Sequence, residues 1–76
     1  MPEIKERDGV IILESDRFDL KIDKARKIYV KRKEENSFSY INHDTPPGMT
    51  AVEKKKVIYE LYRHIDSKLK SEEKNL

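Results

Sequence analysis

The sequence predicts an α+β fold in which a four- or five-stranded antiparallel β-meander is followed by one C-terminal amphipathic helix packed on the sheet. Two observations support this prediction. Short runs in the first half of the chain alternate apolar with polar residues, which is the period of a strand with one buried face. From Ala51 onward, apolar residues recur three and four positions apart, which is the period of a helix with one buried face.

The first predicted hairpin joins residues 4–7 to residues 10–14 through Asp8 and Gly9. An Asp-Gly pair between two strands favours a type I′ turn, because both central residues of that turn need positive φ. Residues 4–7 carry few apolar side chains, so we expect them to form an edge strand. Residues 10–13 are all apolar, which predicts a central strand.

The second predicted hairpin joins residues 18–23 to residues 27–33 through a loop of Lys24, Ala25 and Arg26. Placing Leu20 opposite Val30 puts the apolar side chains of both strands on one face. A helix over residues 23–35 is the alternative, but the β-branched and aromatic residues 28–30 favour a strand. The strand register pairs opposite charges in two places, since it sets Asp19, Lys21 and Asp23 against Lys31, Tyr29 and Lys27 respectively.

The last predicted strand covers residues 37–42, with Phe38 and Tyr40 facing the core. Residues 43–48 contain two prolines and a glycine, which predicts a loop. Thr50 and Glu53 have the spacing of a capping box and mark the start of the helix. We expect residues 1–70 to form a single small domain and residues 71–76 to be a frayed polar tail. The apolar stripe of the helix comprises Ala51, Ile58, Leu61, Tyr62, Ile65 and Leu69.

Composition excludes several classes of protein. The chain has no cysteine, which excludes disulfides, thiolate zinc sites and a cysteine nucleophile. Its longest apolar run, residues 10–13, is far shorter than the about 20 residues that a membrane span needs. The first residues have no apolar signal core. We therefore expect a protein that makes no membrane contact and resides in the cytoplasm.

The residues that could carry catalysis are few. His43 and Asp44 are adjacent in a predicted loop, and neighbouring side chains rarely point together as a base and its orienting acid do. His64 follows Glu60 by four residues, a common arrangement on a helix surface. The spacing of these residues fits no metal site, and the two glycines of the chain form no phosphate-binding loop. We expect a non-enzymatic protein without a cofactor, a metal or a small-molecule substrate.

The positive charge is concentrated in residues 24–35, which hold six bases and two acids, although the whole chain has a net charge of only +2. Basic side chains around an aromatic residue are typical of nucleic-acid binding, because lysines contact phosphates and rings stack on bases. The sequence therefore predicts a nucleic-acid-binding surface on the outer face and tip of the second hairpin, for a single strand or a duplex. Its candidate residues are Lys21, Lys24, Arg26, Lys27, Tyr29, Lys31 and Lys33, together with Lys54 and Lys55 near the start of the helix.

The predicted register also weakens part of this hypothesis. Lys27 and Lys31 each face an acid across the hairpin and are therefore less available to phosphates. Arg32 falls on the core side, where its stem would pack and its head would reach water.

The alternative function is a protein–protein interaction module, such as a small inhibitor or accessory protein of the kind that viruses encode. It would be homodimeric through an edge strand, residues 4–7 or 37–42, or through helix contacts that include Tyr59.

No sequence motif identifies a family. The predicted order of four antiparallel strands followed by one helix resembles the transcriptional coactivators that bind single-stranded DNA on a curved sheet. This resemblance is one of predicted topology, and a shared topology does not by itself imply a shared function.

Overall fold

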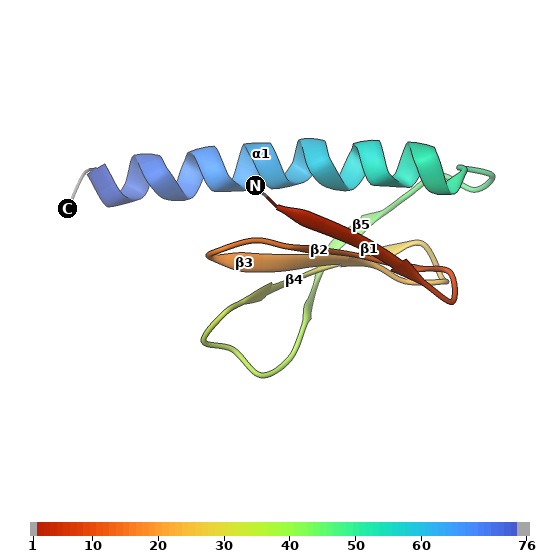
Figure 1. Cartoon of the computed structure of the whole chain (residues 1–76), viewed down its shortest axis with the longest axis horizontal. Helices are drawn as coiled ribbons and strands as arrows, with labels where there is room; N and C mark the ends of the chain where they lie inside the picture. Colours follow the sequence, from red (N-terminus) through yellow and green to blue (C-terminus); the bar gives the residue numbers. More distant parts are fainter. Residues whose placement is uncertain (1, 75–76) are drawn as a thin grey trace.

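The computed structural model describes residues 2–74. Within these residues, a five-stranded antiparallel sheet is followed by a single helix packed on it, which confirms the predicted fold class (Figure 1). Strands that follow one another in the chain are neighbours in the sheet, as in a meander. The elements are β1 (Glu3–Arg7), β2 (Val10–Glu14), β3 (Phe18–Ile22), β4 (Lys27–Arg32), β5 (Ser39–Asp44) and α1 (Ala51–Lys74).

The β1–β2 hairpin closes through the predicted type I′ turn. Arg7 pairs with Val10, and the turn residues Asp8 and Gly9 have φ values of 53° and 79°. Glycine suits the second position because it has no Cβ to clash at positive φ. The prediction of the turn is confirmed, and β2 lies inside the sheet between β1 and β3.

The β3–β4 hairpin has the predicted register. Leu20 faces Val30, and the outward pairs of Asp19 with Lys31 and Lys21 with Tyr29 follow as expected. The loop closes with a hydrogen bond of 3.0 Å from the Arg26 N–H to the carbonyl of Asp23. Arg26 has a φ of 68°, so the loop is a turn followed by one left-handed residue, a common form of three-residue hairpin loop.

The last strand differs from its prediction in position and in phase. β5 begins two residues later than expected, and Tyr40 faces Tyr29 on the solvent side with 41% of its surface exposed. Ile41 packs against the core instead. Phe38 lies before the strand, with its ring beside an outward-facing lysine. The prediction that Phe38 and Tyr40 face the core is therefore wrong, because a period of two does not tell which of the two alternating sets is buried.

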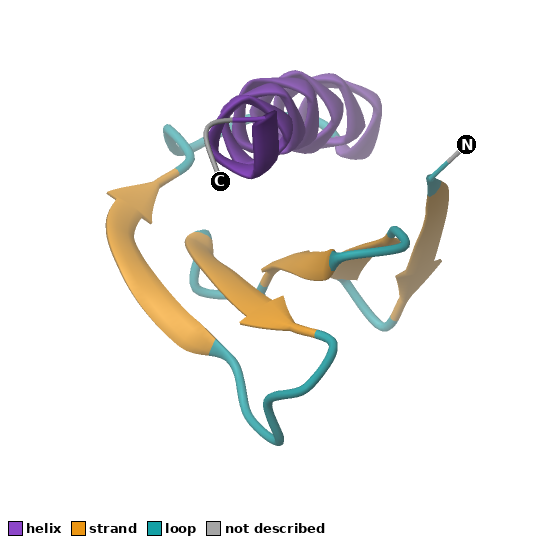
Figure 2. Ribbon diagram, turned by 90° about the vertical axis from the view of Figure 1, so that its left-hand side faces the viewer, coloured by secondary structure: helices purple, strands orange, loops and turns teal. Residues whose placement is uncertain are grey.

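The hydrophobic core lies between the sheet and the helix. The sheet curves around α1, so that its concave face holds the core and its convex face is turned to solvent (Figure 2). The helix contacts β3, the middle strand of the sheet, and its neighbour β2. The buried side chains come from three central strands and the helix, and they are Ile11, Leu13, Phe18, Leu20, Ile22, Ile28 and Ile58.

The helix begins with the predicted capping box. The Thr50 hydroxyl accepts the N–H of Glu53 at 3.2 Å, and the Glu53 carboxylate accepts the N–H of Thr50 at 3.1 Å. These hydrogen bonds hold the pKa of Glu53 below its ordinary value. Within residues 2–74, no helix combines the length and the apolarity that crossing a membrane requires.

The helix is longer than expected. It continues to Lys74, so the prediction of a frayed tail is wrong for residues 71–74, and residues 75–76 lie outside the described residues. Its 24 residues span about 36 Å, against about 17–20 Å for each strand, and its last turns extend past the sheet (Figure 1). Arg17 ties these turns to the β2–β3 loop, since its guanidinium lies 3.4 Å from Asp66 and 2.9 Å from Glu73.

Candidate nucleic-acid interface

The convex face of the sheet carries a continuous row of side chains across its strands. The strand registers set the members of this row opposite one another in turn. Because neighbouring residues of a strand point to opposite faces, the row points away from the buried core. From β1 to β5, its members are Lys5, Ile12, Lys21, Tyr29 and Tyr40.

Rings and lysines alternate in the β3–β5 half of this face. The Lys21 ammonium lies 4.7 Å from the ring centre of Tyr29 and 4.5 Å from that of Phe38. The Tyr29 and Tyr40 rings are 5.7 Å apart, and the Lys27 ammonium lies 5.6 Å from the centre of Tyr40. We call these five residues the ring–lysine row. Each cation–ring contact contributes about 0.5–1 kcal/mol at an exposed site.

The hydroxyl groups of both tyrosines are fixed by carboxylates. Tyr29 donates to Asp23 at 2.9 Å, and Tyr40 donates to Asp44 at 2.6 Å. These hydrogen bonds raise the pKa of both tyrosines. Partial burial alone would raise the pKa of Asp23, but the N–H of Lys27 and the Tyr29 hydroxyl hydrogen-bond to its carboxylate and lower the pKa overall. The two rings are therefore held in place before any ligand arrives.

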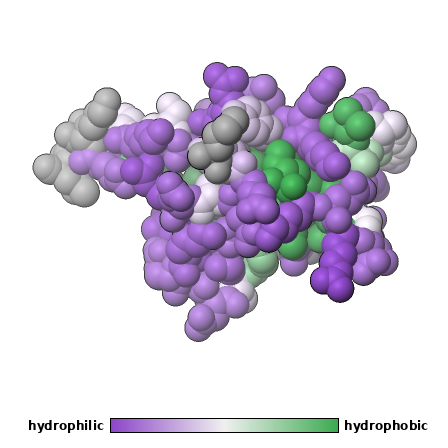
Figure 3. Space-filling model, in the orientation of Figure 1, coloured by the Kyte–Doolittle hydropathy of each residue, from purple (hydrophilic) through white to green (hydrophobic). Residues whose placement is uncertain are grey.

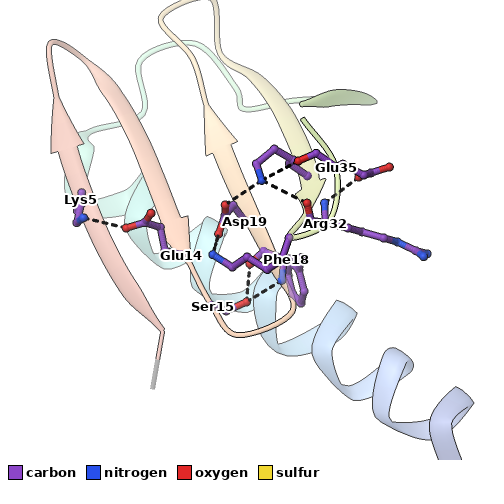
Figure 4. Close-up of polar contacts among 9 residues, drawn as sticks. Lys5, Glu14, Ser15, Phe18, Asp19, Arg32 and Glu35 are labelled. Atoms are coloured by element: carbon purple, nitrogen blue, oxygen red, sulfur yellow. Dashed lines mark hydrogen bonds and ion pairs between the residues drawn. The ribbon is translucent and has the colours of Figure 1, made fainter. Parts of the chain in front are cut away.

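Asp19 forms ion pairs with two of the candidate lysines. Its carboxylate, only 10% exposed, lies 2.6 Å from the Lys33 ammonium and 3.6 Å from that of Lys31 (Figure 4). The pairing of Asp19 with Lys31 was expected from the register. The closer contact between Asp19 and Lys33 was not expected, because Lys33 lies beyond the end of β4, where the strand register makes no prediction. Both lysines are thus less available to a ligand than Lys21 and Lys27, which make no ion pair within the described residues.

The β3–β4 tip lies against the rest of the molecule. The Lys24 stem runs beside Gly9 of the neighbouring turn, 3.5 Å from where a Cβ of that glycine would stand. The Arg26 guanidinium donates to the carbonyl of Thr45 at 2.7 Å, while the Thr45 N–H donates to the carbonyl of Arg26 at 2.8 Å. Lys24 is exposed and continues the positive surface, whereas Arg26 is partly committed to holding the loop before α1.

The helix lysines do not join the ring–lysine row. They belong to α1, which covers the concave face, on the opposite side of the sheet (Figure 2). Lys55 makes an ion pair of 3.3 Å with Glu6 of β1. Lys54 is half-buried and makes no ion pair within residues 2–74. The nine candidate residues therefore form two separate groups, and the hairpin group shares its face with the rings of Phe38 and Tyr40.

Two members of the ring–lysine row were missed as site residues from the sequence. Phe38 and Tyr40 were assigned to the core because they are aromatic and alternate with serines. The available signal was Ile41, whose burial would have reversed the phase of β5 and brought Tyr40 beside Tyr29. Choosing Ile41 for the core would have predicted the complete row.

The two histidines of the chain lie apart in the structure. His43 and His64 are both exposed and lie in different elements, β5 and α1. No group of three or more His, Cys, Asp or Glu that could hold a metal ion occurs in the described part of the chain. No family model, no curated protein and no solved structure matches this chain.

Proposed function

We propose that this protein binds single-stranded nucleic acid on the convex face of its sheet, as a non-enzymatic module. The observation that carries the proposal is the ring–lysine row, in which Lys21 and Lys27 stand beside three aromatic rings. Bases stack on such rings and phosphates pair with such ammonium groups. This proposal requires neither a catalytic residue nor a cofactor.

The exposed ring favours a single strand over a duplex. In a duplex the faces of the bases are already stacked on one another, whereas a single strand offers them to the protein. Tyr40 is 41% exposed and its hydroxyl is anchored to Asp44, so the ring is accessible and its position is fixed. Stacking of one base on such a ring is worth about 1–3 kcal/mol.

The distribution of charge supports binding of the phosphates at Lys21, Lys27 and the tip. Lys31 and Lys33 are paired with Asp19, and Lys5 lies 2.8 Å from Glu14. Lys21 and Lys27, beside the tyrosines, and Lys24, at the tip, make no ion pair within residues 2–74. We therefore assign the phosphate contacts to Lys21, Lys24 and Lys27, with smaller contributions from Arg26, Lys31 and Lys33.

The experiment is a titration of fluorescently labelled oligonucleotides, single-stranded and as the matching duplex, at low and moderate salt. The expected result is tighter binding of the single strand, with an affinity that falls by about 0.7 log units per decade of salt for each phosphate neutralised. Lys27→Glu should weaken binding by about fivefold or more, which corresponds to about 1 kcal/mol.

Lys68→Glu is the matched control, because Lys68 is exposed on α1 and its replacement changes the net charge equally. Equal loss of affinity in the two variants would reduce the effect to net charge and contradict the proposed surface. Binding that does not respond to salt would contradict the phosphate contacts. Equal affinity for the duplex would contradict the stacking of bases on Tyr40.

Self-association through the edge of β5 is the second candidate function. The other edge strand, β1, has four charged residues among its five, and such charges discourage strand pairing. β5 has one residue of the types Asp, Glu, Lys and Arg among its six, and within the described sheet it pairs only with β4. Sedimentation that shows a monomer at high protein concentration would exclude this candidate.

A further inference from the structure

A second surface lies on α1, away from the convex face of the sheet. An open groove of about 540 Å³ is lined by Val52, Lys55, Lys56, Tyr59 and Glu60. Lys55 and Lys56 lie three and four residues after Val52, and Tyr59 and Glu60 lie four residues after Lys55 and Lys56, so the five side chains share one side of the helix. Val52 is 63% exposed and Tyr59 is 37% exposed. In Figure 3, hydrophobic surface reaches solvent near the N-terminal end of the helix.

The groove is apolar at its centre and positive at its rim. Lys55 and Lys56 line the groove, whereas Lys54 is half-buried and is not part of the lining. The acids of the helix nearest to these two lysines in the sequence are Glu53, which is committed to the capping box, and Glu60, which also lines the groove. Lys55 lies 3.3 Å from Glu6, but both side chains are about two-fifths exposed, and such pairs are worth about 0–1 kcal/mol. A carboxylate from a partner can therefore replace Glu6 at little cost.

We infer that this groove binds an acidic amphipathic helix of a partner protein. An aliphatic side chain of the partner would insert between Val52 and Tyr59, and its carboxylates would face Lys55 and Lys56. Recognition of this kind places apolar anchors in a groove and uses the charged rim for specificity.

Two other occupants fit the surface less well. In a two-fold contact between copies of this chain, centred on the groove, Lys56 would face its own counterpart, and like charges so placed are unfavourable. A nucleic acid would use the lysines but would leave the apolar surface of Val52 without a partner.

The test uses the full chain, labelled with ¹⁵N, and an unlabelled synthetic peptide of amphipathic helical design with leucines on one face and glutamates on the other. The expected result is saturable shifts of the amide signals of residues 52–60. A peptide with lysines in place of the glutamates, and one with serines in place of the leucines, should not produce them.

Variants separate the groove from net charge. Lys56→Glu should weaken peptide binding by about fivefold or more, and Lys68→Glu, with the same change of charge, should not. Val52→Ser should also weaken binding, and because Val52 is exposed its replacement leaves the core intact.

Three results would overturn this inference. These are no shifts at residues 52–60 with the acidic peptide, equal shifts with the basic peptide, or shifts there with a single-stranded oligonucleotide but not with the peptide. The last result would assign the groove to nucleic acid. The first two results do not bear on the proposed function of the convex face, which the oligonucleotide titration tests separately. The third would also count against the convex face as the oligonucleotide-binding surface.

Discussion

Tyr40 of β5 lies directly across from Tyr29 of β4, with the two ring centres 5.7 Å apart and the ring planes inclined by 53°. Each ring is anchored by its own hydroxyl, one to Asp23 and the other to Asp44. The two carboxylates therefore fix the positions of the rings. Such a pair forms a rigid aromatic surface at the open side of the sheet.

The hydrogen-bonded hydroxyls of Tyr29 and Tyr40 predict that two of the four tyrosines lose their phenolic protons at raised pH. Because the hydrogen bonds to Asp23 and Asp44 raise the pKa of Tyr29 and Tyr40, their protons should be lost at higher pH than the proton of a tyrosine whose hydroxyl makes no such hydrogen bond. The stabilisation from these bonds is present below the ordinary tyrosine pKa of about 10 and is lost as pH rises through the raised values. Ultraviolet absorbance during an alkaline titration measures this. The part of the absorbance change that occurs at the highest pH should disappear in the double variant Tyr29→Phe, Tyr40→Phe. Its persistence in that variant would contradict its assignment to these two tyrosines.

Asp19→Asn should increase the affinity for a single-stranded oligonucleotide. The variant keeps the shape of the side chain but releases Lys31 and Lys33 from their ion pairs, which adds up to two phosphate contacts. We expect a gain of about two- to tenfold at low salt, a steeper salt dependence and a loss of about 1–3 kcal/mol in stability. Anisotropy titrations and urea unfolding measure these quantities.

Glu14→Gln is the control for that experiment. It also removes one carboxylate from the convex face, but it releases only Lys5, which lies in the edge strand β1 and outside the ring–lysine row. An equal gain in affinity from Glu14→Gln would mean that net charge, and not the position of the released lysines, determines binding.

Ile58 should be the most sensitive position of the helix. It is fully buried between α1 and the sheet, so Ile58→Ala should cost about 2–5 kcal/mol and Ile58→Val about 0.5–1.5 kcal/mol. Val52→Ala, on the exposed side of the same helix, should change the free energy of unfolding by less than about 0.5 kcal/mol. Urea unfolding of the three variants tests this order, and a small effect at Ile58 would contradict the described packing of the helix.

The capping box should contribute measurably to the stability of the helix. Thr50→Ala removes the hydroxyl that accepts the Glu53 N–H and should cost about 1 kcal/mol, whereas Thr50→Ser retains that hydroxyl and should cost little. Thermal unfolding followed by circular dichroism distinguishes the two. Equal stability of the alanine and serine variants would show that the cap contributes nothing.

The parts of the fold that were predictable from sequence are those where several local signals agree. Asp8 and Gly9 require one type of turn, and the alternation around Leu20 and Val30 permits one register that also pairs opposite charges. The capping box at Thr50 and the apolar stripe around Ile58 define the start and the buried face of the helix. Each of these features has a sequence signal carried by residues that lie close together in the chain.

The wrong predictions concern features that are determined by contacts between residues far apart in the chain. The phase of β5 depends on whether Tyr40 or Ile41 covers the core, and both are apolar enough for either role. β5 also contains extra residues relative to β4 near Asn42, whose φ of 62° marks a local irregularity that alternation does not predict. The helical conformation of residues 71–74 accompanies a contact from Arg17, more than 50 residues earlier in the chain. For the same reason, the sequence predicted Lys21, Lys27 and Tyr29 as members of the surface but not Phe38 and Tyr40.

The most direct test of the proposed function is the affinity of Tyr40→Ala for a labelled single-stranded oligonucleotide, compared with Tyr40→Phe and Tyr59→Ala. Loss of the Tyr40 ring should weaken binding by about fivefold to more than a hundredfold, equivalent to about 1–3 kcal/mol of base stacking. Tyr40→Phe keeps the ring and should retain most of the affinity, and Tyr59→Ala removes a tyrosine from the helix and should not weaken binding. If Tyr40→Ala binds the oligonucleotide as tightly as the unaltered protein does, the convex face is not the nucleic-acid-binding surface.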